Sequence, residues 1–380
     1  MGRPLDGITV VTLEQAVAAP FASRQLADLG ARVIKIERDA GDFARLYDRT
    51  VHGEASYFVW INRGKESVVL DLKSESGIAA LRTLVASADV FIQNLAPGAI
   101  ERLGLGSDVA MASNPSLIYV SISGYGRGGS YEQKKAYDLL VQCETGLLSV
   151  TGTPEAPAKV GISIADIASG MYAYTGVLSA LIQRGRTGVG DVLEISMLEA
   201  LGEWMMQPYL YAEYSGTQAP RSGAQHASIA PYGPFNTADG TVFFGIQNER
   251  EWAVFCDTVL GDAAMASSPQ FDSGANRVAN RPALHERIDA VLGSLSKADV
   301  LARLDAAGIA NAELRDMRGF SAHPQLAERD RWREVSLPNG DTARSLIPPV
   351  SANTYDAAMG AVPALGAHTA AVLAEFGITE

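Results

Sequence analysis

The sequence predicts an α/β protein with a Rossmann-like parallel sheet in a large domain and a smaller α+β domain beside it in the chain. Up to Met197, short apolar runs alternate with helical stretches, which is typical of parallel strands covered by helices on both faces. Beyond Ala230 the order changes to a β-hairpin followed by several helices. These two observations indicate two domains built on different plans.

The first elements form a βαβ unit. We expect Ile8–Leu13 to be a strand, Pro20–Leu29 a helix closed by Gly30, and Val33–Ile36 the next strand. The same alternation then continues with strands at 67–72, 89–93 and 117–121, a helix from Ser74 through Val85, and a short helix opened by Pro97.

A long apolar helix is expected at residues 167–183, and Asp166 stands at its start. Aspartate is a preferred N-cap, because its carboxylate accepts hydrogen bonds from the first turn of a helix. A helix start also carries positive potential, which favours an ionised carboxylate and steadies a developing oxyanion. Asp166 therefore has two compatible interpretations, a helix cap and a nucleophile. A turn at 184–190 and a strand at 193–197 are expected to follow.

The second half of the chain predicts a small domain and a return to the large one. Residues 198–224 are rich in large apolar side chains and need a surface to pack against. Asp239-Gly240 predicts a hairpin turn. We expect helices at 249–260, 282–295 and 298–307, irregular strands near 335–348, and a last helix at 367–376 closed by Gly377. The expected division is a large domain at 1–197, a connector at 198–224, a small domain at 225–330, and a return segment at 331–380 that completes the large domain.

Composition excludes several classes of function. The chain has 380 residues, 47% of them hydrophobic, which suffices for two large cores. A net charge of −12 without a long basic run argues against a nucleic-acid partner. We find no signal-peptide pattern and no apolar run of membrane-spanning length. Cys143 and Cys256 have no His or Cys at ligand spacing, so we expect no metal site and no disulfide, and a cytoplasmic protein.

The sheet invites a nucleotide-binding interpretation, but the motifs do not fit one. The first strand-to-helix turn, Leu13–Pro20, lacks the glycines that let backbone approach a pyrophosphate, which disfavours a dehydrogenase. Gly124–Gly129 lacks the Gly-Lys-Ser/Thr ending of a P-loop and predicts a mobile loop. The five histidines form no triad with a nucleophile, although His226 lies in a loop that is a candidate cover for a site.

Four cations lie near strand ends or in the loops that follow them, where open α/β sheets bind ligands: Arg38, Lys73, Arg102 and Lys135. Each one alone is also typical of a solvated surface charge.

Six motifs together resemble those of a family III CoA-transferase, the group that includes formyl-CoA transferase, carnitine CoA-transferases and α-methylacyl-CoA racemases. The resemblance covers nearly the whole chain. The motifs are Pro4-Leu-Asp-Gly-Ile8, Leu29-Gly-Ala-Arg-Val-Ile-Lys-Ile-Glu-Arg38, Leu70-Asp-Leu-Lys73, Asn94-Leu-Ala-Pro-Gly-Ala-Ile-Glu-Arg-Leu-Gly104, Ala165-Asp-Ile-Ala-Ser-Gly170 and Leu365-Gly-Ala-His-Thr369.

The resemblance implies that Asp166 is a covalent nucleophile and that coenzyme A (CoA) lies along the strand ends as a substrate, with no tightly bound cofactor. Arg38, Lys73, Arg102 and Lys135 then match positions near its phosphates. The positions around its adenine and pantetheine parts are Leu70, Asn94, Leu95 and Tyr137, to which we add the neighbouring Asp138. The resemblance also implies an interlocked homodimer, with the active site between the large domain of one subunit and the small domain of the other.

Within the family, the residues favour a transferase over a racemase. The racemases pair the equivalent aspartate with a histidine and a glutamate, and their positions fall at Tyr137 and at about Asn248 in this chain. Tyrosine is a poorer base than histidine at neutral pH. The α-methylacyl-CoA racemase or epimerase therefore remains the alternative, beside a protein that binds acyl-CoA without turnover.

Substrate choice is expected to follow three positions. Val17 stands where formyl-CoA transferase has a glutamine, and the segment that begins at His226 differs from the glycine-rich lid of that enzyme. These differences resemble the members that act on dicarboxylates such as succinate, malate, citramalate or mesaconate. Arg45 or Arg49 is our candidate for a clamp on a distal carboxylate.

Overall fold

The computed structural model describes residues 2–378. The chain divides into two compact units. Unit 1 comprises Met1–Leu147, Val160–Gln207 and Ala327–Glu380, and unit 2 comprises Leu148–Lys159 and Pro208–Leu326. In the described part of the chain, no helix is both long enough and apolar enough to cross a membrane.

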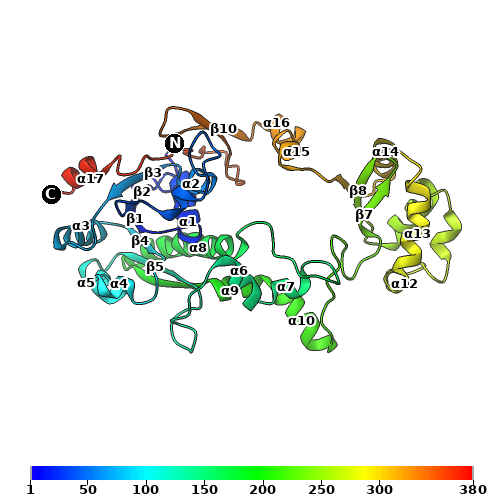
Figure 1. Ribbon diagram of the computed structural model, residues 1–380, viewed down its shortest axis with the longest axis horizontal. Helices are drawn as coiled ribbons and strands as arrows, with labels where there is room; N and C mark the ends of the chain where they lie inside the picture. The colour runs from blue at the N-terminus through cyan, green and yellow to red at the C-terminus, as the bar shows by residue number, and fades with distance from the viewer. Residues whose placement is uncertain (1, 379–380) are drawn as a thin grey trace. The chain divides into compact units, whose positions relative to one another are not determined.

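Unit 1 is built on a sheet of six parallel strands in the order β3-β2-β1-β4-β5-β6, which confirms the predicted parallel sheet (Figure 1). The strands are β1 (Thr9–Leu13), β2 (Arg32–Glu37), β3 (Lys65–Val69), β4 (Val90–Gln93), β5 (Ile118–Ser123) and β6 (Asp191–Ser196). The strand order reverses between β1 and β4. In open sheets of this kind, ligands bind outside the carboxyl ends of the strands at that reversal.

Helices cover both faces of the sheet. They are α1 (Ala18–Asp28), η1 (Phe43–Leu46), α2 (Ser56–Asn62), α3 (Glu75–Ala86), α4 (Ala99–Arg102), α5 (Ser107–Ser113), α6 (Asp138–Glu144), α8 (Ile164–Thr187), α9 (Met197–Trp204) and α17 (Thr369–Glu375). Successive strand residues point to opposite faces. Val10 belongs to a core with α1 and α8, and Val11 belongs to a core with α3 and α17.

The return segment protects the edge strand β3. The backbone N–H of Ser67 donates to Nδ1 of His368 at 3.1 Å, and that of Val69 donates to the Thr369 hydroxyl at 2.9 Å. The C-terminal helix α17, red in Figure 1, begins at this point. A hairpin of β10 (Trp332–Ser336) and β11 (Thr342–Leu346) precedes it. Because an open strand edge is a site of aggregation, these contacts give the Leu365–Thr369 motif a structural role.

Unit 2 holds a separate antiparallel sheet in the order β7-β8-β9, formed by Tyr232–Thr237, Gly240–Gly245 and Asn311–Glu313. Its first two strands meet at the predicted Asp239-Gly240 turn. The helices are α11 (Glu249–Val254), η2 (Phe255–Val259), η3 (Ala263–Ser267), α12 (Gly274–Ala279), α13 (Arg281–Leu292), α14 (Lys297–Ala306) and α15 (Met317–Ser321). The helices α7 (Leu147–Val150), α10 (Met206–Ser215) and α16 (Pro324–Glu328) lie where the units meet in sequence.

The prediction that Asp166 is the N-cap of its helix was wrong. Helix α8 begins at Ile164, so Asp166 is its third residue, and Ser163 at the cap position makes no capping bond with its side chain. The cap comes instead from Asp138, whose Oδ1 accepts from the backbone N–H of Ala165 at 2.8 Å. A cap donated by a distant segment leaves no signal next to the helix.

Other boundaries also differ from those expected, and two of them have an evident cause. Helix α8 continues to Thr187, through most of the predicted turn, and ends at Gly188 with a positive φ of 73°. Strand β3 begins at Lys65 rather than at 67, because the Lys65 side chain is buried by an ion pair that the sequence pattern does not reveal.

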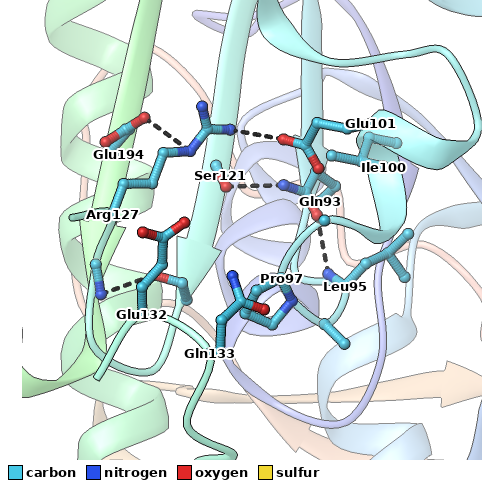
Figure 2. A pocket seen from close by; sticks show the side chains of 14 residues that line it. Gln93, Leu95, Pro97, Ile100, Glu101, Ser121, Arg127, Glu132, Gln133 and Glu194 are labelled. Carbon is cyan, nitrogen blue, oxygen red and sulfur yellow. Dashed lines mark hydrogen bonds and ion pairs between the residues drawn. The ribbon is translucent and has the colours of Figure 1, made fainter. Parts of the chain in front are cut away.

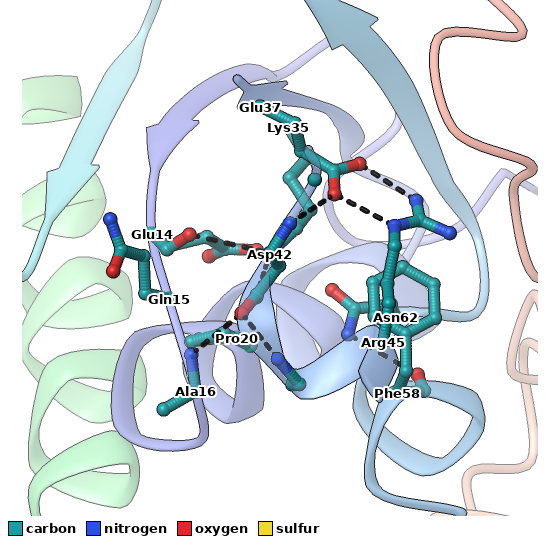
Figure 3. Close-up of polar contacts among 12 residues, drawn as sticks. Glu14, Gln15, Ala16, Pro20, Lys35, Glu37, Asp42, Arg45, Phe58 and Asn62 are labelled. Carbon is teal, nitrogen blue, oxygen red and sulfur yellow. Dashed lines mark hydrogen bonds and ion pairs between the residues drawn. The ribbon is translucent and has the colours of Figure 1, made fainter. Parts of the chain in front are cut away.

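Buried ions link β1, β2 and β3, from the end of β1 to the start of β3. The Lys65 Nζ donates to Glu14 at 2.7 Å, to the Pro20 carbonyl at 3.0 Å and to Asn62 at 3.0 Å. The Lys35 Nζ lies 3.3 Å from Glu14 and 2.9 Å from Asp42 (Figure 3). All four ionic side chains are nearly inaccessible to solvent.

The charge states of these groups follow from their partners. Burial by itself raises the pKa of Glu14, but Lys65 and Lys35 reverse this and hold it below its ordinary value. Burial lowers the pKa of Lys65 to about 7, against the opposing charge of Glu14. Because Lys65 donates to three acceptors, and only the ammonium form has three N–H groups, we assign it a positive charge.

We expect Glu14→Gln to lower the free energy of unfolding of unit 1 by about 3 kcal/mol, because it leaves two buried ammonium groups short of a counter-charge. Denaturant unfolding at pH 7 measures this. The control is Glu66→Gln, which removes a partly exposed partner of Arg32 and is expected to cost less than about 1 kcal/mol. If the two variants lose equal free energy of unfolding, the buried network contributes no more to stability than an exposed ion pair.

Candidate functional site

A crevice of ≈ 540 Å³ lies at the carboxyl ends of β1, β2 and β3. It is lined by the loops that follow these strands. Of the residues expected to bind CoA, it contains Arg38, Leu70, Lys73 and Leu95. The Nε of Arg38 donates to the Gly41 carbonyl at 3.0 Å, which fixes one edge of its guanidinium at the crevice. The crevice is where the strand order places a ligand site.

A second pocket, of ≈ 270 Å³, lies across the segment 94–98 from the crevice, and Leu95 lines both. Figure 2 shows Arg127 between two carboxylates, 3.1 Å from Glu101 on α4 and 3.1 Å from Glu194 on β6. These ion pairs connect the glycine loop at 124–129 to α4 and β6. Gln93 also lines this pocket, and its side-chain amide donates to the Ser121 hydroxyl at 2.7 Å.

Asp166 lies where the first turns of α8 pack closely on the start of α1. Gly170, one turn further along α8, makes this approach possible, since a Cβ there would lie 2.7 Å from the Ala18 carbonyl oxygen. Val17 is buried beside Ile167, the residue after Asp166. The structure therefore brings the predicted nucleophile and the predicted substrate residue Val17 into one region.

The environment of Asp166 raises the pKa of its carboxyl to about 7, because the group is desolvated and lies near the charge of Asp138. Among residues 2–378, no group donates a hydrogen bond to the Asp166 carboxylate itself. Its ordinary pKa of about 3.9 would leave it ionised at neutral pH, so the environment makes the charged form costlier than the sequence suggests. A carboxylate that is poorly solvated and unpaired has lone pairs available for attack on a carbonyl.

The segment 15–17 beside α8 is held from two sides. The Asn94 side chain accepts from the Gln15 backbone N–H and donates to the Gln15 carbonyl, both at 2.9 Å. Asp42 accepts from the Ala16 N–H at 3.2 Å (Figure 3). Ala16 has a positive φ of 61°, a strained conformation for a residue with a side chain. Asn94, expected to bind CoA, thus fixes the wall of the site through backbone contacts.

Two tyrosines near Asp166 were missed in the sequence. The Tyr57 hydroxyl lies 3.3 Å from the Ser163 hydroxyl just before α8, and the Tyr47 ring meets the Tyr57 ring edge-on at 5.6 Å. Desolvation and the charges of Asp42 and Asp166 raise the pKa of Tyr47 to about 12, so it remains a neutral hydrogen-bond donor. The density of aromatic residues at 57–60 is the sequence signal for Tyr57.

Arg45 is occupied by a structural role. Its guanidinium forms two bonds to Glu37, at 2.7 and 2.8 Å, and its carbon lies 3.7 Å from the centre of the Phe58 ring (Figure 3). This geometry does not support Arg45 as a clamp for a substrate carboxylate. Arg49 is exposed.

The remaining predicted residues lie elsewhere on the surface of the two units. Arg102, Lys135 and Tyr137 are exposed in unit 1 and line neither of the two pockets. Asp138 has both carboxylate oxygens engaged, by the start of α8 and by Gln142. His226 belongs to unit 2, where its ring stacks on Tyr232 with centroids 5.2 Å apart. In residues 2–378, no group of three His, Cys, Asp or Glu side chains is placed to hold a metal ion.

Known proteins are similar to this chain over nearly its whole length. The profile described as "CoA-transferase family III" matches residues 5–369. The chain is 32% identical to the succinate–glutarate CoA-transferase of Agrobacterium fabrum, over 99% of this chain and 96% of that protein. It is 30% identical to the succinyl-CoA:mesaconate CoA-transferase of Haloarcula hispanica, over 98% of this chain and 96% of that protein.

A solved structure has a similar fold. A CaiB/BaiF family protein from Brucella suis matches with a TM-score of 0.88 and 33% identity, covering 99% of this chain and 100% of that one. The family profile, the full-length relatives and this structural match all cover the crevice and the start of α8. The chain belongs to CoA-transferase family III, and it is a CoA-transferase.

Proposed function

We propose that the protein moves CoA from a dicarboxylic acyl-CoA to a free dicarboxylate through a covalent intermediate at Asp166. The observation that carries the proposal is the Asp166 carboxylate, which is desolvated, accepts no hydrogen bond from the described residues and stands at the start of a helix. The helix start supplies positive potential for the oxyanion that forms during acyl transfer.

The reaction needs only the two substrates and Asp166. The carboxylate attacks the donor acyl carbonyl and expels CoA thiolate, which leaves a mixed anhydride. The thiolate attacks the aspartyl carbonyl of the anhydride, giving an aspartyl-CoA thioester and the free donor acid. The acceptor carboxylate then attacks this thioester to form a second anhydride and release the thiolate. Finally the thiolate attacks the acceptor acyl carbonyl, which yields the new CoA ester and frees Asp166.

CoA is placed in the crevice of unit 1 in this proposal. Arg38 and Lys73 line it and supply positive charge for phosphates, and Leu70 and Leu95 supply apolar contacts. The names of the succinate, glutarate and mesaconate enzymes similar to this chain support dicarboxylates as substrates. Since Arg45 is bound to Glu37, we assign the distal carboxylate to Arg49. The free cysteines Cys143 and Cys256 support a cytoplasmic location.

A panel of acyl-CoA donors and free acids tests this function. We expect new CoA esters, fastest with four- and five-carbon dicarboxylates, when products are followed by mass spectrometry in heavy water. Esters without α-deuterium support transfer, whereas an unchanged ester that gains α-deuterium identifies a racemase. Asp166→Ala serves as the matched variant, expected to fold normally, bind acyl-CoA and form no new ester. Binding without any exchange by the wild-type protein would instead show a non-catalytic role.

We expect kcat/KM to fall below pH 7 with an apparent pKa of about 7, because only ionised Asp166 attacks the thioester. Below that pH the rate drops about tenfold for each unit. The profile is measured from pH 5 to 9 with two different donors. An apparent pKa that changes with the donor belongs to the donor, whereas one that stays the same belongs to the enzyme. A flat profile over this range contradicts Asp166 as the titrating nucleophile.

The raised pKa of Asp166 also makes the stability of unit 1 depend on pH. Because the folded-state pKa of Asp166 is raised, its favourable contribution is complete below about pH 4 and is lost as the pH rises through 7. Removing the charge with Asp166→Asn is therefore expected to stabilise unit 1 at pH 8 by on the order of 2 kcal/mol, and to have little effect at pH 4. Thermal unfolding at the two pH values separates this outcome from a general effect of the substitution.

The homodimer is a further part of the proposal. Residues 198–224 carry six exposed large apolar side chains, Trp204, Met206, Tyr209, Leu210, Tyr211 and Tyr214, the last with 83% of its surface accessible. Soluble proteins rarely leave such a group uncovered. We expect sedimentation at micromolar concentration to give twice the 40.2 kDa chain mass. A stable, folded monomer under these conditions excludes the dimer.

A further inference from the structure

A buried amide connects α6 to the segment that leads into α8, the helix of the nucleophile. Gln142 on α6 has no accessible surface. Its Nε2 donates to Asp138 Oδ2 at 2.7 Å, and its Oε1 accepts from the backbone N–H of Val160 at 3.0 Å. Both ends of the amide are therefore used, one on α6 and one on the segment that leads into α8. A buried amide of this kind is expensive unless both ends are paired.

The second oxygen of Asp138 replaces the missing cap of α8. Oδ1 accepts from the N–H of Ala165 at 2.8 Å and lies 3.4 Å from the N–H of Asp166. These are the second and third residues of the helix, the two positions that a capping side chain normally serves. Ser163, the residue at the cap position, instead faces the Tyr57 hydroxyl.

The contacts therefore form a chain that ends at the backbone of the nucleophile. Val160 fixes Gln142, Gln142 fixes one oxygen of Asp138, and the other oxygen holds the backbone of Asp166. None of these contacts is made with the Asp166 carboxylate, which stays available for attack. The charged or titratable groups that face this carboxylate are Asp138, from α6, and Tyr47, from the segment after η1.

We propose that Asp138 and Gln142 are a positioning pair for the nucleophile, in which Gln142 orients the Asp138 carboxylate so that it caps α8 and holds Asp166 in place. The inference rests on the proposed function of Asp166. It differs from the expectation that Asp138 binds CoA, since Asp138 does not line the crevice and neither of its oxygens is free.

The pair is tested by exchanging the carboxylate of residue 138 and the amide of residue 142, first one at a time and then together. Asp138→Asn keeps an oxygen for the cap but turns an N–H₂ group toward the N–H₂ of Gln142. Gln142→Glu places two carboxyl groups where the structure has a 2.7 Å hydrogen bond. Each single variant therefore creates one mismatched contact in a buried site, and we expect each to lower kcat at least about tenfold.

The double variant Asp138→Asn/Gln142→Glu restores every contact, because the new amide donates to the new carboxylate, which still accepts from Val160. We expect its kcat to return to within about threefold of the wild-type value, a coupling that independent sites do not show. The negative charge then lies further from Asp166, so the acid limb of the pH profile moves to lower pH. If the pair only stabilised the fold, the single substitutions would lower the stability and leave kcat unchanged.

KM separates positioning from binding. If the pair acts through Asp166, KM for the acyl-CoA stays within about twofold of the wild-type value while kcat falls. A rise in KM with unchanged kcat would overturn the inference and return Asp138 to the CoA site. Gln183→Glu makes the same chemical change at an exposed position on α8 and is expected to alter neither constant.

Folding and function are read separately in this experiment. If a single variant does not fold, the double variant is compared directly with the wild type, and a folded but inactive double variant overturns the pair. If the wild-type protein transfers no CoA, the proposed function itself is refuted. Activity that depends on Asp166 but is insensitive to both single substitutions refutes only the positioning pair.

Discussion

The packing of β1, β2 and β3 on one another depends on buried charges that neutralise one another. Glu14 follows β1, Lys35 lies within β2 and Lys65 begins β3, so the ion pairs of Glu14 with the two lysines join three neighbouring strands. Such groups are costly to bury, and they are stable only when each one is paired and hydrogen-bonded. Because Asp42 joins the same network and also holds Ala16, the ions fix the loop that separates the crevice from the start of α8.

Because this loop is fixed, the region around Asp166 tolerates a backbone strain and a desolvated charge that an ordinary helix start would not contain. Ala16 remains in a left-handed conformation, and Asp166 is desolvated next to a second carboxylate. Strain and desolvation both cost free energy, and both persist only where the surrounding structure leaves no alternative. The close packing of α8 on α1 at Gly170 supplies the same rigidity from the other side.

Several side chains that look like ligand contacts in the sequence are part of this framework. Asn94 binds the backbone of Gln15, Arg45 binds Glu37, and Asp138 caps α8. Their residue types are those that also recognise phosphates and carboxylates, since the same hydrogen bonds serve a backbone or a ligand. A polar residue near a binding site thus supports either the ligand or the residue that touches it, and the distinction lies in its partners.

The sequence by itself determined the parallel sheet, the hairpin of unit 2 and the prominence of Asp166, because these depend on local periodicity, turn chemistry and contiguous motifs. It also placed Arg38 and Lys73 at one edge, since the carboxyl ends of parallel strands meet there, and the family resemblance added Leu70 and Leu95. Only the tertiary structure decided which group caps α8, which arginine is already paired and how costly the Asp166 charge is. These properties depend on contacts between segments distant in the chain, such as Asp138 with Ala165, and on the exclusion of water, and neither leaves a pattern in neighbouring residues.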